Sequence, residues 1–113
     1  MSDRANSLKG EVEIRLGGER FVMRPSFAAI MAIEAELGGV VPLARRAAKG
    51  DFGLKDLTVI VQEGLVARGT RLDRNEVGAM ILTEGLANVA GPVRDFLTAV
   101  LSGGPSEAAR GHD

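Results

Sequence analysis

The chain contains no cysteine, tryptophan or tyrosine and only one histidine, His112. Without cysteine, neither a disulfide framework nor a thiolate metal site can form, and a reducing cytoplasm is the simplest setting. No apolar run approaches the roughly 20 residues of a membrane span, and the N-terminus MSDRANSLKG lacks the apolar core of a signal peptide. These absences predict a cytosolic protein with no membrane partner.

The chain also lacks an excess of charge of one sign, since it contains 14 Lys and Arg residues and 15 Asp and Glu residues. A dedicated nucleic-acid binder normally carries a strong basic excess, so we expect no nucleic-acid partner. Two local basic groups remain, which form either a solvated face or, if folding brings them together, a surface for an acidic partner segment. They are Arg45, Arg46 and Lys49, and Arg68, Arg71 and Arg74.

Reactive side chains have no arrangement that suggests catalysis. His112 is the penultimate residue of a segment with few apolar side chains, so no third group is expected to orient it as a base. Glu34 and Glu36 are two residues apart and do not share a helix face, whereas Asp73 and Glu76 fit a helix capping box. No phosphate-binding glycine motif or metal-ligand spacing is present. We therefore expect no catalytic, cofactor or metal site, and no enzyme.

What the chain does contain is a change of hydrophobic period between Gly10 and Gly38. Alternating apolar residues on both sides of Gly17-Gly18 predict a β-hairpin, because Gly-Gly supplies the positive φ angles of a two-residue turn. Glu11 should then face Arg24, and Arg15 should face Arg20. The turn predicts the apolar-face pairs Leu16 with Glu19, Ile14 with Phe21 and Val12 with Met23.

Glycine-separated helices follow the hairpin. Ser26 can cap a helix that runs to Leu37, with Gly38 as its stop. Further helices are predicted from near Pro42 to Lys49-Gly50, from Leu54 to Ala67, and from Asp73 toward Leu86. The helix that Ser26 caps should bury one apolar stripe, formed by Phe27, Ile30, Ile33 and Leu37.

The last segment has the clearest amphipathic spacing, but Gly91-Pro92 interrupts it. Since proline inside a helix loses a hydrogen bond and clashes with the preceding turn, we expect two helices here rather than one. The predicted fold class is α+β, mainly α: an N-terminal hairpin followed by four to five short helices in one domain. The predicted limits are a flexible N-terminus over 1–9, the domain over 10–102 and a disordered tail over 103–113. The apolar stripe consists of Val89, Val93, Phe96, Leu97, Val100 and Leu101.

A short internal similarity joins the segment from Val59 to Gly69 to the segment from Met80 to Gly91, since both contain Glu-Gly-Leu. Two amphipathic helices that end alike by chance would explain it. A duplicated helical hairpin is the alternative, although two copies are too few to indicate a solenoid.

The hairpin and the segments that follow it also carry a family resemblance. The ordered motifs are LGGERFV, RPSFAAI, IEAELGG, LARR and two EGL triplets. Over Gly10 to Leu101 the chain resembles the small tail protein of gene transfer agents and related phages, a family described both as a tail tube protein and as a tail assembly chaperone. The resemblance implies a role in tail morphogenesis and tail-protein partners. Its motifs are structural and identify no binding residues.

Together these features predict a protein-binding function. We expect a tail assembly chaperone that shields apolar stretches of the tape-measure or tail-tube protein by a groove or by β-augmentation. A structural tail-tube subunit is the main alternative, a small enzyme is a third, and the hairpin edges leave self-pairing open. The candidate partner contacts are Val93, Phe96, Val100 and Leu101, then Phe21 and Met23; the alternative for each is a place in the domain's own core.

Overall fold

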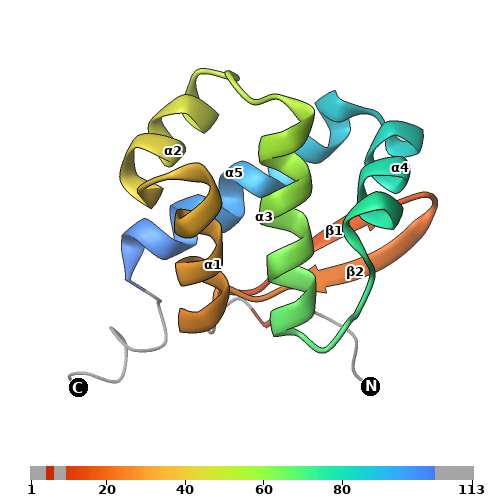
Figure 1. Ribbon diagram of the computed structural model, residues 1–113, viewed down its shortest axis with the longest axis horizontal. Coiled ribbons are helices and arrows are strands. Elements are labelled where there is room, and N and C mark those ends of the chain that lie inside the picture. Colours follow the sequence, from red (N-terminus) through yellow and green to blue (C-terminus); the bar gives the residue numbers. More distant parts are fainter. Residues whose placement is uncertain (1–4, 7–9, 104–113) are drawn as a thin grey trace.

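A computed structural model describes residues 5–6 and 10–103 of the chain. A two-stranded antiparallel hairpin precedes five helices, so the predicted mainly helical α+β fold is confirmed (Figure 1). The predicted flexible N-terminus and tail fall almost entirely outside the described residues. The elements are β1 (Val12–Leu16), β2 (Glu19–Met23), α1 (Phe27–Leu37), α2 (Val40–Ala48), α3 (Leu54–Ala67), α4 (Arg74–Glu84) and α5 (Leu86–Ser102).

The hairpin has the predicted register. Gly17 and Gly18 turn the chain with φ angles of 58° and 87°, values that favour glycine at both positions. Arg15 lies opposite Arg20 as expected, but Arg20 forms an ion pair of 2.9 Å with Glu13, which lowers the repulsion. The confirmed pairs are Val12 with Met23, Ile14 with Phe21 and Leu16 with Glu19.

Capping side chains begin two of the helices where the sequence predicts. The Ala29 N–H donates to Ser26 Oγ over 3.1 Å at the start of α1. The N–H of Glu76 donates to Asp73 Oδ1 over 2.7 Å, and Glu76 Oε1 accepts from the Asp73 N–H over 2.9 Å, which completes the capping box of α4. The bounds of α3 are those predicted, whereas α2 begins two residues earlier than Pro42, at Val40.

Helix α5 corrects the expectation of two C-terminal helices, because it continues through Pro92 from Leu86 to Ser102. A proline inside a helix costs about 3 kcal/mol. Four side chains of α5 are fully buried along one stripe, and each such burial contributes about 1.5–3 kcal/mol. Tertiary burial therefore outweighs the local cost of the proline. The buried residues are Val89, Val93, Phe96 and Leu97.

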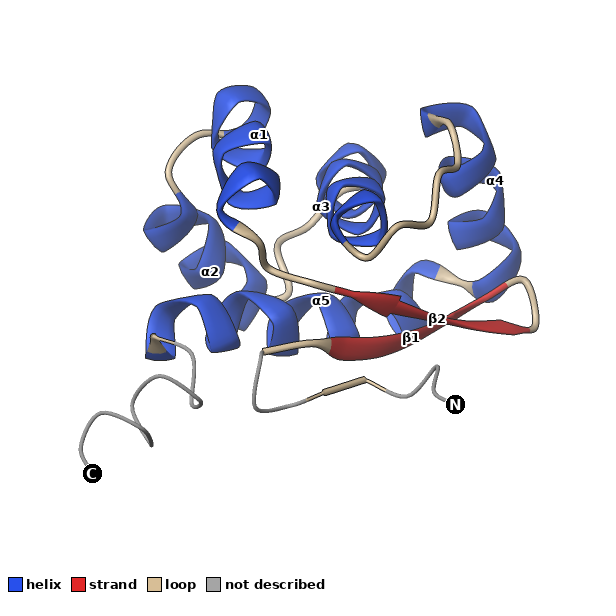
Figure 2. Ribbon diagram, turned by 90° about the horizontal axis from the view of Figure 1, so that it is seen from below, coloured by secondary structure: helices blue, strands red, loops and turns tan. Residues whose placement is uncertain are grey.

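The elements form two layers (Figure 2). Helices α1, α3 and α4 make one layer, and α2, α5 and the hairpin make the other. Helix α3 is central to the first layer and packs against its neighbours α1 and α4, and against β2 and α5 below. Leu57 to Val61 are therefore all buried, and the core lies between the layers.

The two Glu-Gly-Leu triplets adopt different structures. Gly64 lies inside α3, whereas Gly85 has a φ of 102° and separates α4 from α5. A duplicated helical hairpin would place both triplets in equivalent positions. The structure thus favours the chance explanation of the similarity.

No single helix in the described part of the chain is long and apolar enough to cross a membrane. Helices α1 and α2 pass that test only as a pair, by length and composition, with a bend of 77° between them.

Candidate functional site

The six residues predicted to contact a partner do not form one surface. Val93, Phe96 and Met23 are fully buried in the domain core, where a partner cannot reach them in this fold. Their positions agree with the core alternative, because an amphipathic stripe usually faces its own domain. Phe21 and Val100 are half-buried and Leu101 is 51% exposed. Phe21 lies on the hairpin, whereas Val100 and Leu101 lie in the last turn of α5, away from it (Figure 1).

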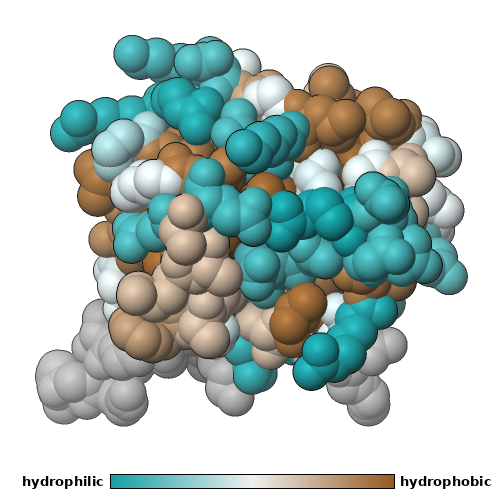
Figure 3. All heavy atoms as spheres, in the orientation of Figure 1, coloured by the Kyte–Doolittle hydropathy of each residue, from teal (hydrophilic) through white to brown (hydrophobic). Residues whose placement is uncertain are grey.

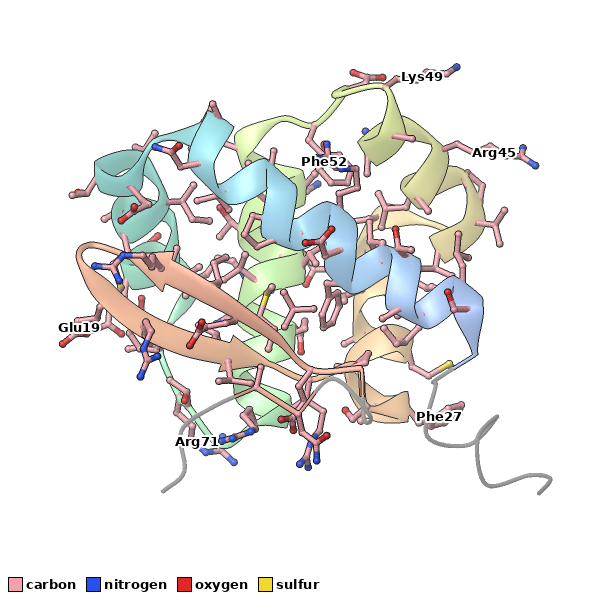
Figure 4. The ribbon with its side chains drawn as sticks, turned by 180° about the vertical axis from the view of Figure 1, so that it is seen from behind. Glu19, Phe27, Arg45, Lys49, Phe52 and Arg71 are labelled. Atoms are coloured by element: carbon pink, nitrogen blue, oxygen red, sulfur yellow. The ribbon has the colours of Figure 1, made fainter. Side chains whose placement is uncertain are left out.

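The largest exposed apolar side chain is Phe27, at the start of α1. Its exposed fraction is 81%, and Met31, one turn later, is 53% exposed. The prediction that Phe27 is buried together with Ile30, Ile33 and Leu37 is therefore wrong. At about 100° per residue, Phe27 lies about 120° around the helix from the buried Ile33, and it points away from the body (Figure 4).

Helix α1 is consequently apolar on two faces. Ala28 and Ala35 are exposed alongside Phe27 and Met31, and we call these four residues the α1 stripe. The opposite face buries Ala29 and Ile33, with Ile30 and Leu37 packed against the core. A helix of a small soluble domain normally presents a polar outer face. The α1 stripe therefore has the composition of a contact surface.

A second apolar surface is the groove between α3 and α4. It has a volume of about 480 Å³, and Leu82 at its upper end is 60% exposed. Seen from the side of α1, α3 and α4, apolar side chains gather over the lower part of α1 and over the upper ends of α3 and α4, with hydrophilic residues between (Figure 3). We call it the α3–α4 groove; its lining residues are Leu54, Lys55, Thr58, Val59, Arg74, Asn75, Gly78, Ala79 and Leu82.

Arg74 crosses the polar strip between these two surfaces. Its two terminal nitrogens bind both carboxylate oxygens of Glu36 on α1, over 3.0 and 2.9 Å, and its Nε donates to Gln62 of α3. Glu63 lies 3.8 Å away. Hydrogen bonding from Arg74 lowers the pKa of Glu36 below its ordinary value. The guanidinium thereby ties α1 and α4 together across α3.

Glu11 is a buried carboxylate whose full role the sequence did not reveal. Only 2% of its side chain is exposed, and its Oε2 accepts from Arg24 Nε at 2.8 Å and Arg68 Nε at 3.2 Å. The Asn6 N–H donates to its other oxygen over 2.9 Å. Burial alone would raise the pKa of Glu11. The Asn6 N–H, Arg24 and Arg68 together outweigh burial, so the pKa lies below its ordinary value.

The hairpin register predicts that Glu11 faces Arg24, but Arg68 comes from the end of α3, far along the sequence. No local signal could have paired it with Glu11. We call Glu11 and its partners Asn6, Arg24 and Arg68 the Glu11 cluster. Because the cluster connects the hairpin to the end of α3 and to Asn6, we assign it a structural role.

The two basic groups considered above are not brought together. Arg45 and Lys49 point into solvent at one end of the molecule, and Arg71 lies at the other end (Figure 4). Arg46 instead binds both oxygens of Asp56, over 3.2 and 3.1 Å, and stacks on Phe52 with its guanidinium carbon 5.7 Å from the ring centre. Within the described residues, these two groups therefore do not form one basic surface for an acidic partner.

The other polar residues weighed for chemistry have structural partners. Glu34 Oε2 accepts from the Val40 N–H over 2.8 Å, and Glu36 binds Arg74. His112 lies outside the described residues. Within residues 5–6 and 10–103, no group of three or more His, Asp or Glu side chains could hold a metal ion.

Comparison with known proteins gives one family. The model of a family described as "Phage tail tube protein, GTA-gp10" matches residues 9–103. No curated protein and no solved structure matches the chain. The match covers the hairpin and all five helices.

Proposed function

Because the chain belongs to the phage tail tube protein family GTA-gp10, which links it to the tails of phages and gene transfer agents, we propose that it acts as a tail assembly chaperone. It binds apolar segments of the tape-measure or tube protein in the bacterial cytoplasm and releases them as the tail polymerises. The mechanism is reversible coverage of apolar surface, without a covalent step.

The observation that carries this proposal is the α1 stripe. Phe27 and Met31 stand one helical turn apart and are both more than half exposed. Aromatic and methionine side chains are enriched at protein interfaces, and burying each contributes about 1.5–3 kcal/mol. An apolar segment of a tail protein would cover this face as a core helix would, and would itself be shielded from aggregation.

A structural tube subunit is the second candidate, and the family description favours it. Tube subunits of long-tailed phages are expected to be rich in β-strands that line a ring. In the described part of this chain the only sheet has two short strands, and most residues are helical. That helical body supports the chaperone role over the tube role. An enzyme is the weakest alternative, since the carboxylates weighed for chemistry have structural partners: Glu34, Glu36, Asp73 and Glu76.

Co-expression with the tape-measure and tube proteins of the same gene cluster tests the proposal. The tagged chain should keep a partner soluble and copurify with it. Phe27→Asp should abolish both effects, because the substitution places a charge in the centre of the contact. Thr98→Asp, which adds the same charge to an exposed position of α5, is the matched control and should preserve them. Unchanged copurification by a correctly folded Phe27→Asp protein would refute the proposed use of α1.

A further inference from the structure

The α3–α4 groove has the shape of a site for a short helix. The two helices run antiparallel (Figure 1): Gln62 near the end of α3 contacts Arg74 at the start of α4, and Thr58 faces Gly78 one turn on. The groove follows α4 from Arg74 to Leu82, a length of about 12 Å at 1.5 Å per residue. Two turns of a partner helix would fill that length.

Gly78 forms part of the groove floor. A Cβ at this position would come no closer than 3.7 Å to Thr58 Oγ1, which is an ordinary contact. The glycine is therefore not required by packing, and its missing side chain leaves the floor open between the two helices. A larger residue here would extend into the space that a partner would occupy.

The two charged residues that line the groove are both basic. Its lining includes Lys55 near one end and Arg74 near the other, and no carboxylate. Arg74 is already bound to Glu36, whereas Lys55 makes no ion pair within residues 10–103. The charge of Lys55 acts on two nearby carboxylates, but Asp56 is already paired with Arg46 and Glu36 with Arg74. Lys55 thus remains available to a carboxylate of a bound segment.

We propose that the α3–α4 groove binds an amphipathic helical segment of a tail protein, with apolar side chains between the two helices and a carboxylate beside Lys55. This inference rests on the proposed function and adds to it a second contact with defined chemistry. In helix-in-groove binding, the groove recognises apolar side chains that stand one turn apart on the bound helix. A charge beside the groove then favours those apolar segments that carry the opposite charge.

Two labelled helical peptides test the chemistry of the groove by fluorescence anisotropy. Both carry leucines along one face; one has a glutamate at each end and the other has lysines there. The glutamate peptide should bind about two- to fivefold more tightly, as expected for one exposed ion pair, and added salt should reduce the difference. Lys55→Glu should reverse the preference. Equal binding of the two peptides, or an unchanged preference in Lys55→Glu, would overturn the proposal.

Gly78→Leu tests the location. Filling the floor should weaken binding of the glutamate peptide by at least about tenfold while the melting temperature stays at or above that of the unmodified chain. Wild-type affinity in Gly78→Leu would place the peptide elsewhere and overturn the proposal. Thr98→Leu, which adds the same side chain at an exposed position of α5 outside the groove, is the matched control and should bind the peptide normally.

An array of overlapping peptides from the co-encoded tail proteins tests the source of the segment. Peptides that bind the unmodified chain but not Gly78→Leu should be apolar with an acidic residue. If no tail-protein peptide depends on Gly78, the groove proposal fails. The proposed chaperone role is judged separately, because the co-expression experiment depends on Phe27 and not on Gly78.

Discussion

Gly64 of α3 lies so close to Met23 of β2 that no side chain fits between them. A Cβ at Gly64 would stand 2.8 Å from Met23 Cβ and 3.3 Å from Phe96 Cε1. The backbone confirms the close approach, since the Arg24 N–H donates to the Gly64 carbonyl over 2.9 Å. The missing side chain therefore lets the hairpin dock directly on the central helix.

Gly64→Ala should destabilise the protein in spite of alanine's better helix propensity. The added methyl forces Met23 or the backbone of β2 to move, which costs about 1–3 kcal/mol of unfolding free energy. Chemical denaturation monitored by circular dichroism measures the change.

Gly78→Ala is the matched control, because it makes the same substitution inside α4 with the nearest atom at 3.7 Å. It should raise the unfolding free energy by about 1 kcal/mol through helix propensity alone. Equal effects of the two substitutions would contradict the close packing described for Gly64.

The Glu11 cluster predicts a loss of stability in acid. Since the pKa of Glu11 is lower in the folded than in the unfolded chain, its contribution is fully present above the unfolded value of about 4.5. It is lost as the pH falls through the folded pKa. Thermal melting between neutral pH and about pH 3 should show this decline.

Glu11→Gln isolates the contribution of this residue. The amide keeps the shape but leaves Arg24 and Arg68 without their carboxylate, and the unfolding free energy at neutral pH should fall by about 1–3 kcal/mol. The variant should also lose less stability than the unmodified chain below about pH 4. A parallel acid profile in both proteins would assign the acid sensitivity to other carboxylates.

Two phenylalanines should respond oppositely to truncation. Phe96→Ala removes a fully buried ring and should cost about 3–5 kcal/mol of unfolding free energy. Phe27→Ala removes an exposed ring and should change it by less than about 0.5 kcal/mol. Denaturation curves measure both; a large loss in Phe27→Ala would mean that the ring packs within the domain.

Pro92→Ala tests the continuity of α5. Alanine restores the N–H that Pro92 lacks, and the unfolding free energy should rise by about 1–2 kcal/mol, less than the full cost of a helical proline because the unfolded chain also gains freedom. A lower melting temperature would indicate that the proline is needed where it stands.

The sequence predicted well the features that neighbouring residues determine. The Gly17-Gly18 turn allows one register in which Ile14 and Phe21 pair, so the hairpin followed directly. The side chains of Ser26 and Asp73 bind backbone N–H groups only three residues away. The positions where α1 and α4 begin could therefore be predicted from the local sequence.

The features set by tertiary packing were predicted poorly. Pro92 is a helix breaker by local rules, yet burial of one face of α5 overrides it. Phe27 resembles a core residue in sequence, but it lies about 120° around α1 from the buried Ile33 and is 81% exposed. The α3–α4 groove and the contact of Arg68 with Glu11 join residues from separate helices or loops, and no pattern in one segment could reveal either.

Quantitative mass spectrometry of purified particles, compared with assembling cells, tests most directly whether this chain leaves the tail before completion. A chaperone should accompany tail proteins in the cells and be nearly absent from finished particles, at far less than one copy per tube ring. Repeated copies of the chain in the tail, in constant proportion to the other tube components, would contradict the chaperone role and identify a structural subunit.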